Sequence, residues 1–90
     1  MACQRFQVTG TVQGVFFRVS TQEKAQQLGL KGWVKNLSDG RVEVMGCGRE
    51  EDLKAFFVWI KQGPPMAVVT DVDVADIRQV ESFSQFEIRY

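Results

Sequence analysis

The stretch Gly10-Thr11-Val12-Gln13-Gly14-Val15-Phe16-Phe17-Arg18 lies between the first strand pattern and the first helical pattern of the chain. Before it, apolar and polar residues alternate over positions 5–11, which indicates a strand with one buried face. After it, Ser20 and Glu23 have the spacing of a capping box, so a helix is expected to begin there. The glycines of the stretch allow backbone N–H groups to approach a ligand closely, and Arg18 adds a fixed positive charge. We therefore predict that this stretch binds an anion, with a phosphoryl group as the first choice.

The remaining patterns supply the other elements. Residues 30–36 and 41–47 have strand patterns, and Asp39-Gly40 between them is a strong hairpin signal. A second helix follows, and its core face is formed by apolar residues at helical spacing, namely Leu53, Phe56, Phe57 and Ile60. Residues 68–74 alternate as a fourth strand and residues 86–90 as a short closing strand, with a loop expected over residues 75–84.

The predicted order is β-α-β-β-α-β with a short closing strand, which is the split βαβ, or ferredoxin-like, pattern of the α+β class. We expect residues 1–90 to form a single domain, with two helices on one face of an antiparallel sheet. In this topology the first and second strands run parallel to each other on either side of the third, so both end at the same edge. Arg18 follows the first strand and Asn36 closes the second. The two side chains are therefore expected to face one pocket.

The composition argues against several classes of function. The chain has no histidine, which removes imidazole bases, histidine-based triads and the commonest zinc ligand. Its net charge is +0, so no nucleic-acid partner is expected. No apolar run approaches the roughly 20 residues that span a bilayer, and residues 1–5 lack the pattern of a signal peptide. Asp71 and Asp73 alternate onto a solvated face, so no metal site is expected. These features indicate a cytoplasmic monomer without membrane contact.

Two motifs carry a resemblance to a known family. The quoted stretch resembles the first signature of the acylphosphatase family, and Gly32-Trp33-Val34-Lys35-Asn36, followed by Gly40, Val42 and Gly48, resembles the second. The resemblance covers nearly the whole chain, including residues 86–90. It implies hydrolysis of the carboxyl–phosphate bond of a small-molecule acyl phosphate, without a metal or cofactor. It also implies that Arg18 binds the phosphoryl group and that Asn36 orients the attacking water.

The chemistry of these residues agrees with that implication. A guanidinium stays charged and presents a planar fork to two phosphoryl oxygens. Asn36 cannot act as a base at neutral pH, but its carboxamide can hold a water in line with the leaving group. That leaving group is a carboxylate whose conjugate acid has a pKa of about 4–5, so no general acid is needed. The remaining phosphoryl oxygens are expected to meet loop amides, so the substrate-binding residues besides Arg18 are Gln13, Gly14, Val15, Phe16 and Phe17.

Two positions depart from the usual residues of the family. Thr11 stands where an arginine is often found, and Leu37 follows Asn36 where many members carry a hydroxyl residue. Neither position holds one of the two principal roles. The loss of a hydroxyl beside Asn36 is expected to weaken the placement of water.

Two other classes of function stay open. The same cradle would also suit a module that senses a phosphorylated metabolite, or a part of a larger carbamoyl-phosphate-handling protein. An RNA-binding domain of the same architecture is the second alternative, but the outward positions of the first and third strands carry no aromatic side chain. Trp33 is expected to cover the outer face of the sheet, with contact to a substrate's acyl group as the alternative.

Cys3 and Cys47 fall at the start of the first strand and the end of the third, which oppose each other in this topology. They can form a disulfide if their Cα atoms approach within roughly 4.4–6.8 Å. The alternative is two free thiols, as is usual in the cytosol. Neither cysteine is expected near the anion site.

Overall fold

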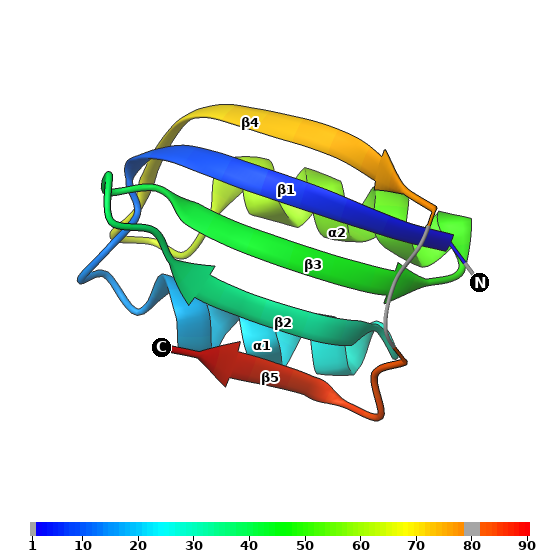
Figure 1. The fold of residues 1–90 in the computed structure, drawn as a ribbon. Coiled ribbons are helices and arrows are strands. Elements are labelled where there is room, and N and C mark those ends of the chain that lie inside the picture. The colour runs from blue at the N-terminus through cyan, green and yellow to red at the C-terminus, as the bar shows by residue number, and fades with distance from the viewer. Residues whose placement is uncertain (1, 79–81) are drawn as a thin grey trace.

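The computed structural model describes residues 2–78 and 82–90 (Figure 1). The described part forms five strands and two helices: β1 (Ala2–Thr11), α1 (Phe17–Gln27), β2 (Lys31–Asn36), β3 (Val42–Gly48), α2 (Glu50–Gln62), β4 (Val68–Ile77) and β5 (Phe86–Arg89). The order of elements is the one predicted. Neither helix in these ranges is long and apolar enough to cross a membrane.

The strands form one sheet in the order β4-β1-β3-β2-β5, and both helices lie on the same face of it (Figure 1). β3 is antiparallel to both β1 and β2, so β1 and β2 run in the same direction. The ferredoxin-like fold is therefore confirmed. β5 pairs in parallel with β2, so the sheet is mixed at this edge rather than wholly antiparallel.

The core lies between the sheet and the helices. Phe6 of β1 is fully buried and meets Phe56 of α2 edge to face, with 5.7 Å between ring centroids. Burying one side chain of this size stabilises a fold by about 1.5–3 kcal/mol. The predicted core face of α2 is confirmed, because Leu53, Phe56 and Ile60 are buried and Phe57 is half-buried.

The first helix begins earlier than the sequence predicted. α1 starts at Phe17, and the backbone N–H of Ser20 already donates to Phe16 O at 3.1 Å within the first turn. The predicted capping box of Ser20 and Glu23 is therefore wrong. Phe17 is buried in the core, and its ring lies 6.0 Å from that of Trp59 on α2. This tertiary packing outweighs the local capping preference and fixes where the helix starts.

β4 is longer than predicted and forms one edge of the sheet. Residues 75–77, expected in a loop, pair with residues 3–5 of β1. The expected loop also included residues 79–81, which lie outside the described residues. Asp71 and Asp73 are exposed, and they face away from the helices because they pair with the outward positions Thr9 and Gln7 of β1.

The sheet face opposite the helices carries Trp33 and both cysteines. Trp33 is only 8% exposed, because Lys35 Nζ and Arg89 Cζ each lie 5.1 Å from the centre of its ring. The tryptophan thus covers the outer face of the sheet. Cys3 and Cys47 are joined by a disulfide, and their Cα atoms are 4.1 Å apart, slightly closer than the usual range given above. This bond lies at the opposite end of β1 from the loop that leads to α1.

Candidate active site

The loop between β1 and α1 forms one wall of a cavity of about 260 Å³. Gly14 and Phe16 both have positive φ angles, of 74° and 62°, so the loop turns sharply before the helix begins. A positive φ favours glycine and is uncommon for a bulky residue such as phenylalanine. The cavity is lined by Val12, Gly14, Phe16, Phe17, Arg18, Val19 and Asn36.

Arg18 and Asn36 reach this cavity from different elements. Arg18 is the second residue of α1 and Asn36 is the last residue of β2. Because β1 and β2 run in the same direction, their C-terminal ends lie at the same end of the sheet. Asn36 therefore lies near the loop that follows β1. Val34 is buried in the core, so Asn36, two positions later, lies on the same face of β2, toward the helices. The two predicted catalytic side chains thus line one cavity.

The N-terminus of α1 makes this cavity attractive to an anion. The N-cap residue Phe16 supplies no side-chain hydrogen bond, and the first turn holds no acidic residue. The first N–H groups of a helix have no partner within the helix, and they form the positive end of its dipole. A phosphoryl group is a suitable ligand for such a terminus.

Arg18 adds a full positive charge to these partial charges. Its Cζ atom lies 4.9 Å from the centre of the Tyr90 ring, which orients the guanidinium through a cation–π contact. In the described part of the chain, no carboxylate lies within 4.0 Å of the Arg18 nitrogens. The charge of Arg18 is therefore available to a bound anion.

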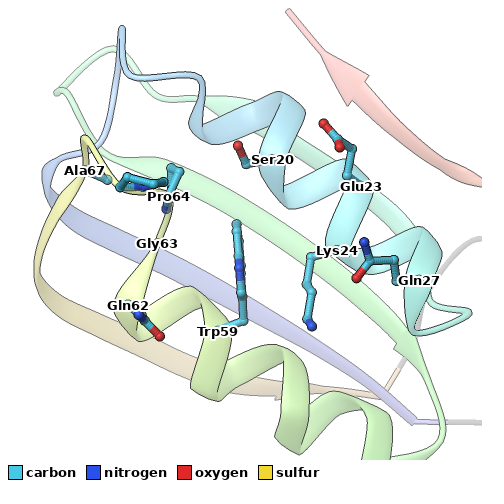
Figure 2. A pocket seen from close by; sticks show the side chains of 10 residues that line it. Ser20, Glu23, Lys24, Gln27, Trp59, Gln62, Gly63, Pro64 and Ala67 are labelled. Carbon is cyan, nitrogen blue, oxygen red and sulfur yellow. The ribbon is translucent and has the colours of Figure 1, made fainter.

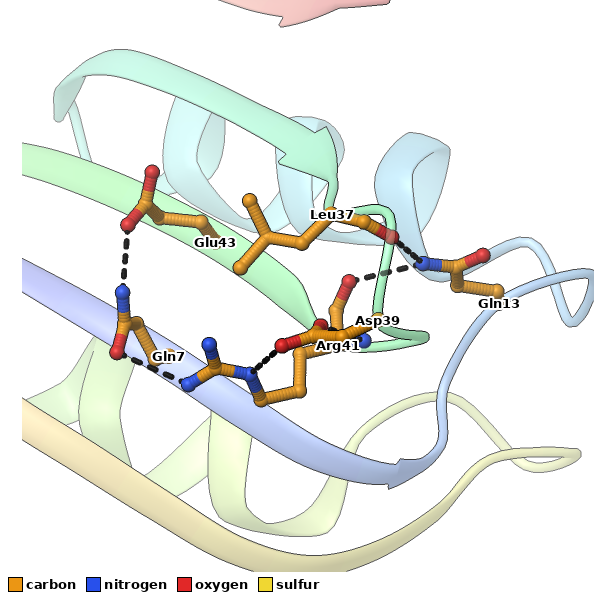
Figure 3. A network of polar contacts seen from close by, with 6 residues as sticks. All are labelled: Gln7, Gln13, Leu37, Asp39, Arg41 and Glu43. Carbon is orange, nitrogen blue, oxygen red and sulfur yellow. Dashed lines mark hydrogen bonds and ion pairs between the residues drawn. The ribbon is translucent and has the colours of Figure 1, made fainter.

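The side chain of Gln13 connects the loop to the hairpin between β2 and β3 by hydrogen bonds (Figure 3). Gln13 Nε2 donates to Leu37 O at 2.8 Å and to Arg41 O at 2.9 Å. Within the hairpin, the Asp39 carboxylate accepts from the backbone N–H of Arg41 at 3.1 Å and from its Nε at 2.8 Å. The backbone hydrogen bond from Arg41 is the main reason why the pKa of Asp39 lies below its ordinary value of 3.8, so this carboxylate is charged at neutral pH.

Four of the six residues predicted to bind substrate line the cavity: Gly14, Phe16, Phe17 and Arg18. The side chains of the other two residues do not line the cavity. Gln13 donates hydrogen bonds to the hairpin, and Val15 packs against the core. Val12 also lines the cavity and lies within the stretch predicted to bind an anion, although it was not among the predicted substrate-binding residues. Two further residues at the site, Val19 and Tyr90, were not predicted from the sequence. Val19 directly follows Arg18, so its place beside the cavity follows once the helix is known to begin at Phe17. No sequence signal indicates that Tyr90 contacts Arg18.

A larger hollow of about 690 Å³ lies between α1 and α2 (Figure 2). Trp59 stands in it, with Lys24 and Glu23 on the opposite helix. Neither Arg18 nor Asn36 lines this hollow, and its charged side chains have opposite signs. The smaller cavity at the start of α1 is therefore the better candidate for the active site.

An α+β fold in which a helix N-terminus and an arginine face one cavity suits a protein that acts on an anion. The family model described as Acylphosphatase matches residues 4–88. An acylphosphatase of Acaryochloris marina (strain MBIC 11017) is 50% identical over 86 residues, covering 96% of this chain and 91% of that protein. The chain belongs to the acylphosphatase family, a family of hydrolases, as its motifs indicated.

Solved structures agree with this assignment. The crystal structure of acylphosphatase from Bacillus subtilis has a TM-score of 0.96 and 43% identity to this chain, with 100% of each chain covered. The crystal structure of full-length HypF in the phosphate- and nucleotide-bound form has a TM-score of 0.85 and 34% identity. That match covers 99% of this chain but 12% of the HypF chain, so the same fold also occurs as a small part of a larger protein.

Proposed function

We propose that the protein hydrolyses acyl phosphates, R–CO–O–PO₃²⁻, to a carboxylate and inorganic phosphate. The observation that carries this proposal is the joint presence of Arg18 and Asn36 in one cavity at the N-terminus of α1. One group is a fixed cation that suits a phosphoryl group, and the other is a neutral amide that suits a water molecule.

In the proposed reaction, Arg18 and the loop amides hold the phosphoryl oxygens while Asn36 holds a water opposite the leaving group. The water oxygen forms a bond to phosphorus as the bond from phosphorus to the acyl oxygen breaks. The electron pair of that bond leaves on the carboxylate, and a proton of the water passes to a phosphoryl oxygen. The transition state of such a transfer is loose, so positioning and charge stabilisation supply most of the catalysis.

We propose that this reaction needs no metal ion. The positive charge that would stabilise the transferred group comes from Arg18 and from the N-terminus of α1. The carboxylate leaving group needs no Lewis acid, because it is a stable anion at neutral pH. Full activity is expected in excess chelator, and a strict requirement for a divalent cation would contradict the mechanism.

The acyl end of the substrate is proposed to lie against the apolar rim of the cavity. Phe16 is 75% exposed and Val19 is 47% exposed, and both line the cavity. Exposed apolar side chains beside a charged site suit a ligand with one anionic and one organic end.

The main test of the proposal is steady-state hydrolysis of acetyl phosphate by the wild-type protein and by Arg18 variants. Arg18→Ala is expected to lower kcat/KM by about 10³-fold or more. Arg18→Lys should lose about 10²-fold, because a point charge does not reproduce the planar fork. Arg49→Ala is the matched control, since Arg49 is an exposed arginine that pairs with Asp52 outside the cavity.

Phosphate binding without turnover would favour the sensing module over the enzyme. Retention of activity in Arg18→Ala would remove Arg18 from the proposed mechanism. Binding of RNA in a filter assay would instead favour the RNA-binding alternative.

We also propose that the protein acts as a cytoplasmic monomer. A site built from α1 and β2 of one chain needs no second subunit to complete it. Sedimentation equilibrium at working concentration should give the mass of one chain, and fractionation of cells should recover the protein with the cytoplasm.

A further inference from the structure

Two separate segments build the candidate active site, and the side chain of Gln13 connects them. The first segment is the loop that leads into α1 and Arg18, and the second is the end of β2 at Asn36, which continues into the hairpin that Gln13 contacts. A water held by Asn36 must be aimed at a phosphoryl group held by the loop. The relative position of the two segments therefore decides how well the water is aligned.

Gln13 binds the hairpin at two points with a single nitrogen atom. Its Nε2 donates one hydrogen bond of 2.8 Å to Leu37 O and another of 2.9 Å to Arg41 O (Figure 3). Leu37 directly follows Asn36 in the chain. Both N–H donors of the Gln13 amide are thus used across 24 and 28 positions of sequence.

The hairpin that receives these bonds is held together by hydrogen bonds of its own. Leu37 N donates to Arg41 O at 2.8 Å and Gly40 N to Leu37 O at 3.2 Å. Within the hairpin, Arg41 also bonds Asp39 through Nε at 2.8 Å, and its Nη1 separately ties the hairpin to Gln7 of β1 at 3.1 Å (Figure 3). A displacement of the hairpin at Leu37 therefore carries Asn36 with it.

We propose that the Gln13 side chain is a positioning residue that sets Asn36 at the correct place relative to the phosphate-binding loop. This inference rests on the proposed function, since it concerns the water-holding role of Asn36. It goes beyond the expected contact of the Gln13 backbone with substrate, because here the side chain acts on the hairpin. Loss of the tether leaves Arg18 and α1 in place, so phosphate binding remains while the water loses its alignment.

The chemistry of the contact requires an uncharged side chain with two donors on one atom. A glutamate would place its oxygens against two carbonyl oxygens, and an asparagine is one methylene group too short to span the same distance. Methionine fills a similar volume without any N–H donor. Gln13→Met is therefore the variant that removes the tether with the least change in packing.

The test compares Gln13→Met with a matched glutamine elsewhere in the fold. Gln22 is half-buried like Gln13, and its Nε2 donates to Phe86 O at 3.1 Å, which ties α1 to β5 outside the cavity. For each variant, kcat on acetyl phosphate, the inhibition constant of inorganic phosphate and the melting temperature are measured. Gln13→Met should lower kcat by about 10–100-fold and leave the phosphate inhibition constant within about two-fold. Gln22→Met should leave both unchanged.

A double-variant cycle separates positioning from a general structural role. In an Asn36→Ala background, Gln13→Met should lower kcat by less than about two-fold, because the group that it positions is already absent. If the two losses multiply instead, Gln13 does not act through Asn36 and the inference is overturned. If Gln13→Met does not fold, Gln13→Asn replaces it in the same cycle, with the same split between kcat and phosphate affinity expected.

The outcomes distinguish this inference from the function on which it rests. Wild-type turnover with equal behaviour of Gln13→Met and Gln22→Met overturns the positioning role alone. Equal losses of kcat and of phosphate affinity in Gln13→Met would also overturn it, since they would mean damage to the loop itself. Absence of turnover in the wild-type protein overturns the proposed function and this inference together.

Discussion

Arg18 and Asn36 line the same cavity but differ in what they can do there. A guanidinium binds oxyanions in the ground state and in the transition state, so its loss affects binding and turnover together. A carboxamide carries no charge and contributes mainly by orienting water. The two residues should therefore give different kinetic signatures when they are replaced.

For Asn36→Ala we expect kcat to fall by about 10²-fold while inorganic phosphate still inhibits at nearly the wild-type concentration. Removal of the amide takes away the alignment of water but leaves the phosphate-binding loop intact. Steady-state kinetics with phosphate as competitor provide the measurement. Asn36→Asp serves as the contrasting variant, because a carboxylate in the cavity should repel phosphate and weaken inhibition as well. Equal loss of phosphate binding in Asn36→Ala would contradict a role limited to water.

At the level of single residues, the sequence predicted that Arg18 and Asn36 face one pocket, because their motifs lie at the ends of two parallel strands. The tether formed by the Gln13 side chain was not predictable in the same way. It depends on where a hairpin 24 to 28 positions away comes to lie, which the spacing of residues does not contain. The contact of Tyr90 with Arg18 has the same origin, since it requires β5 to add beside β2.

The start of α1 is the element on which the candidate site depends most. Phe16 adopts a left-handed backbone conformation with φ at 62° and exposes its ring, whereas the neighbouring Phe17 is buried. The same residue type therefore has two different tasks at adjacent positions. The left-handed backbone of Phe16 forms the turn before α1, and the buried ring of Phe17 packs the start of the helix into the core.

This difference predicts opposite effects on stability. A left-handed conformation costs a non-glycine residue about 1–2 kcal/mol, so Phe16→Gly should leave the free energy of unfolding unchanged or raise it by up to about 1 kcal/mol. Phe17→Ala should lower it by about 3–5 kcal/mol, because it leaves a cavity in the core. Urea denaturation of the two variants gives the measurement. A loss of several kcal/mol in Phe16→Gly would show that its exposed ring makes contacts important for the fold.

The elements with strong local signals were predicted well. α2 has an apolar stripe, acidic residues in its first turn and Lys61 in its last, all of which favour the same helix. α1 has no comparable signal, since its N-cap contributes no side-chain bond and its start is set by tertiary packing. The extra length of β4 likewise comes from pairing with β1, so residues 75–77 look like a loop until their partner is known.

Across the whole molecule, the disulfide and the candidate site occupy opposite ends of β1. Cys3 pairs with Cys47 where β1 begins, and the phosphate-binding loop starts where β1 ends. The disulfide thus lies at one end of the sheet, and the candidate active site lies at the other. Loss of the disulfide should therefore lower the stability of the fold with little effect on turnover.

Reduction of the Cys3–Cys47 bond is expected to lower the free energy of unfolding by about 2–4 kcal/mol, because the bond closes a loop with a sequence separation of 44. The value of kcat on acetyl phosphate should stay within about two-fold at temperatures where the reduced protein remains folded. Guanidinium denaturation with and without reductant measures the first effect. The double variant Cys3→Ser, Cys47→Ser is the control and should not respond to reductant. Free thiols on both cysteines in non-reducing mass spectrometry would contradict the bond.

β4 leaves one long backbone edge of the sheet without a partner strand in the described part of the chain. Such an edge is a template on which a second molecule can add a strand, and growth of this kind ends in insoluble fibres. Here the edge bears Asp71, Asp73 and Asp76, all of them exposed. Two copies that approached edge to edge would bring like charges near one another, which is unfavourable. The aspartates of β4 therefore oppose edge-to-edge pairing of this strand with a second copy.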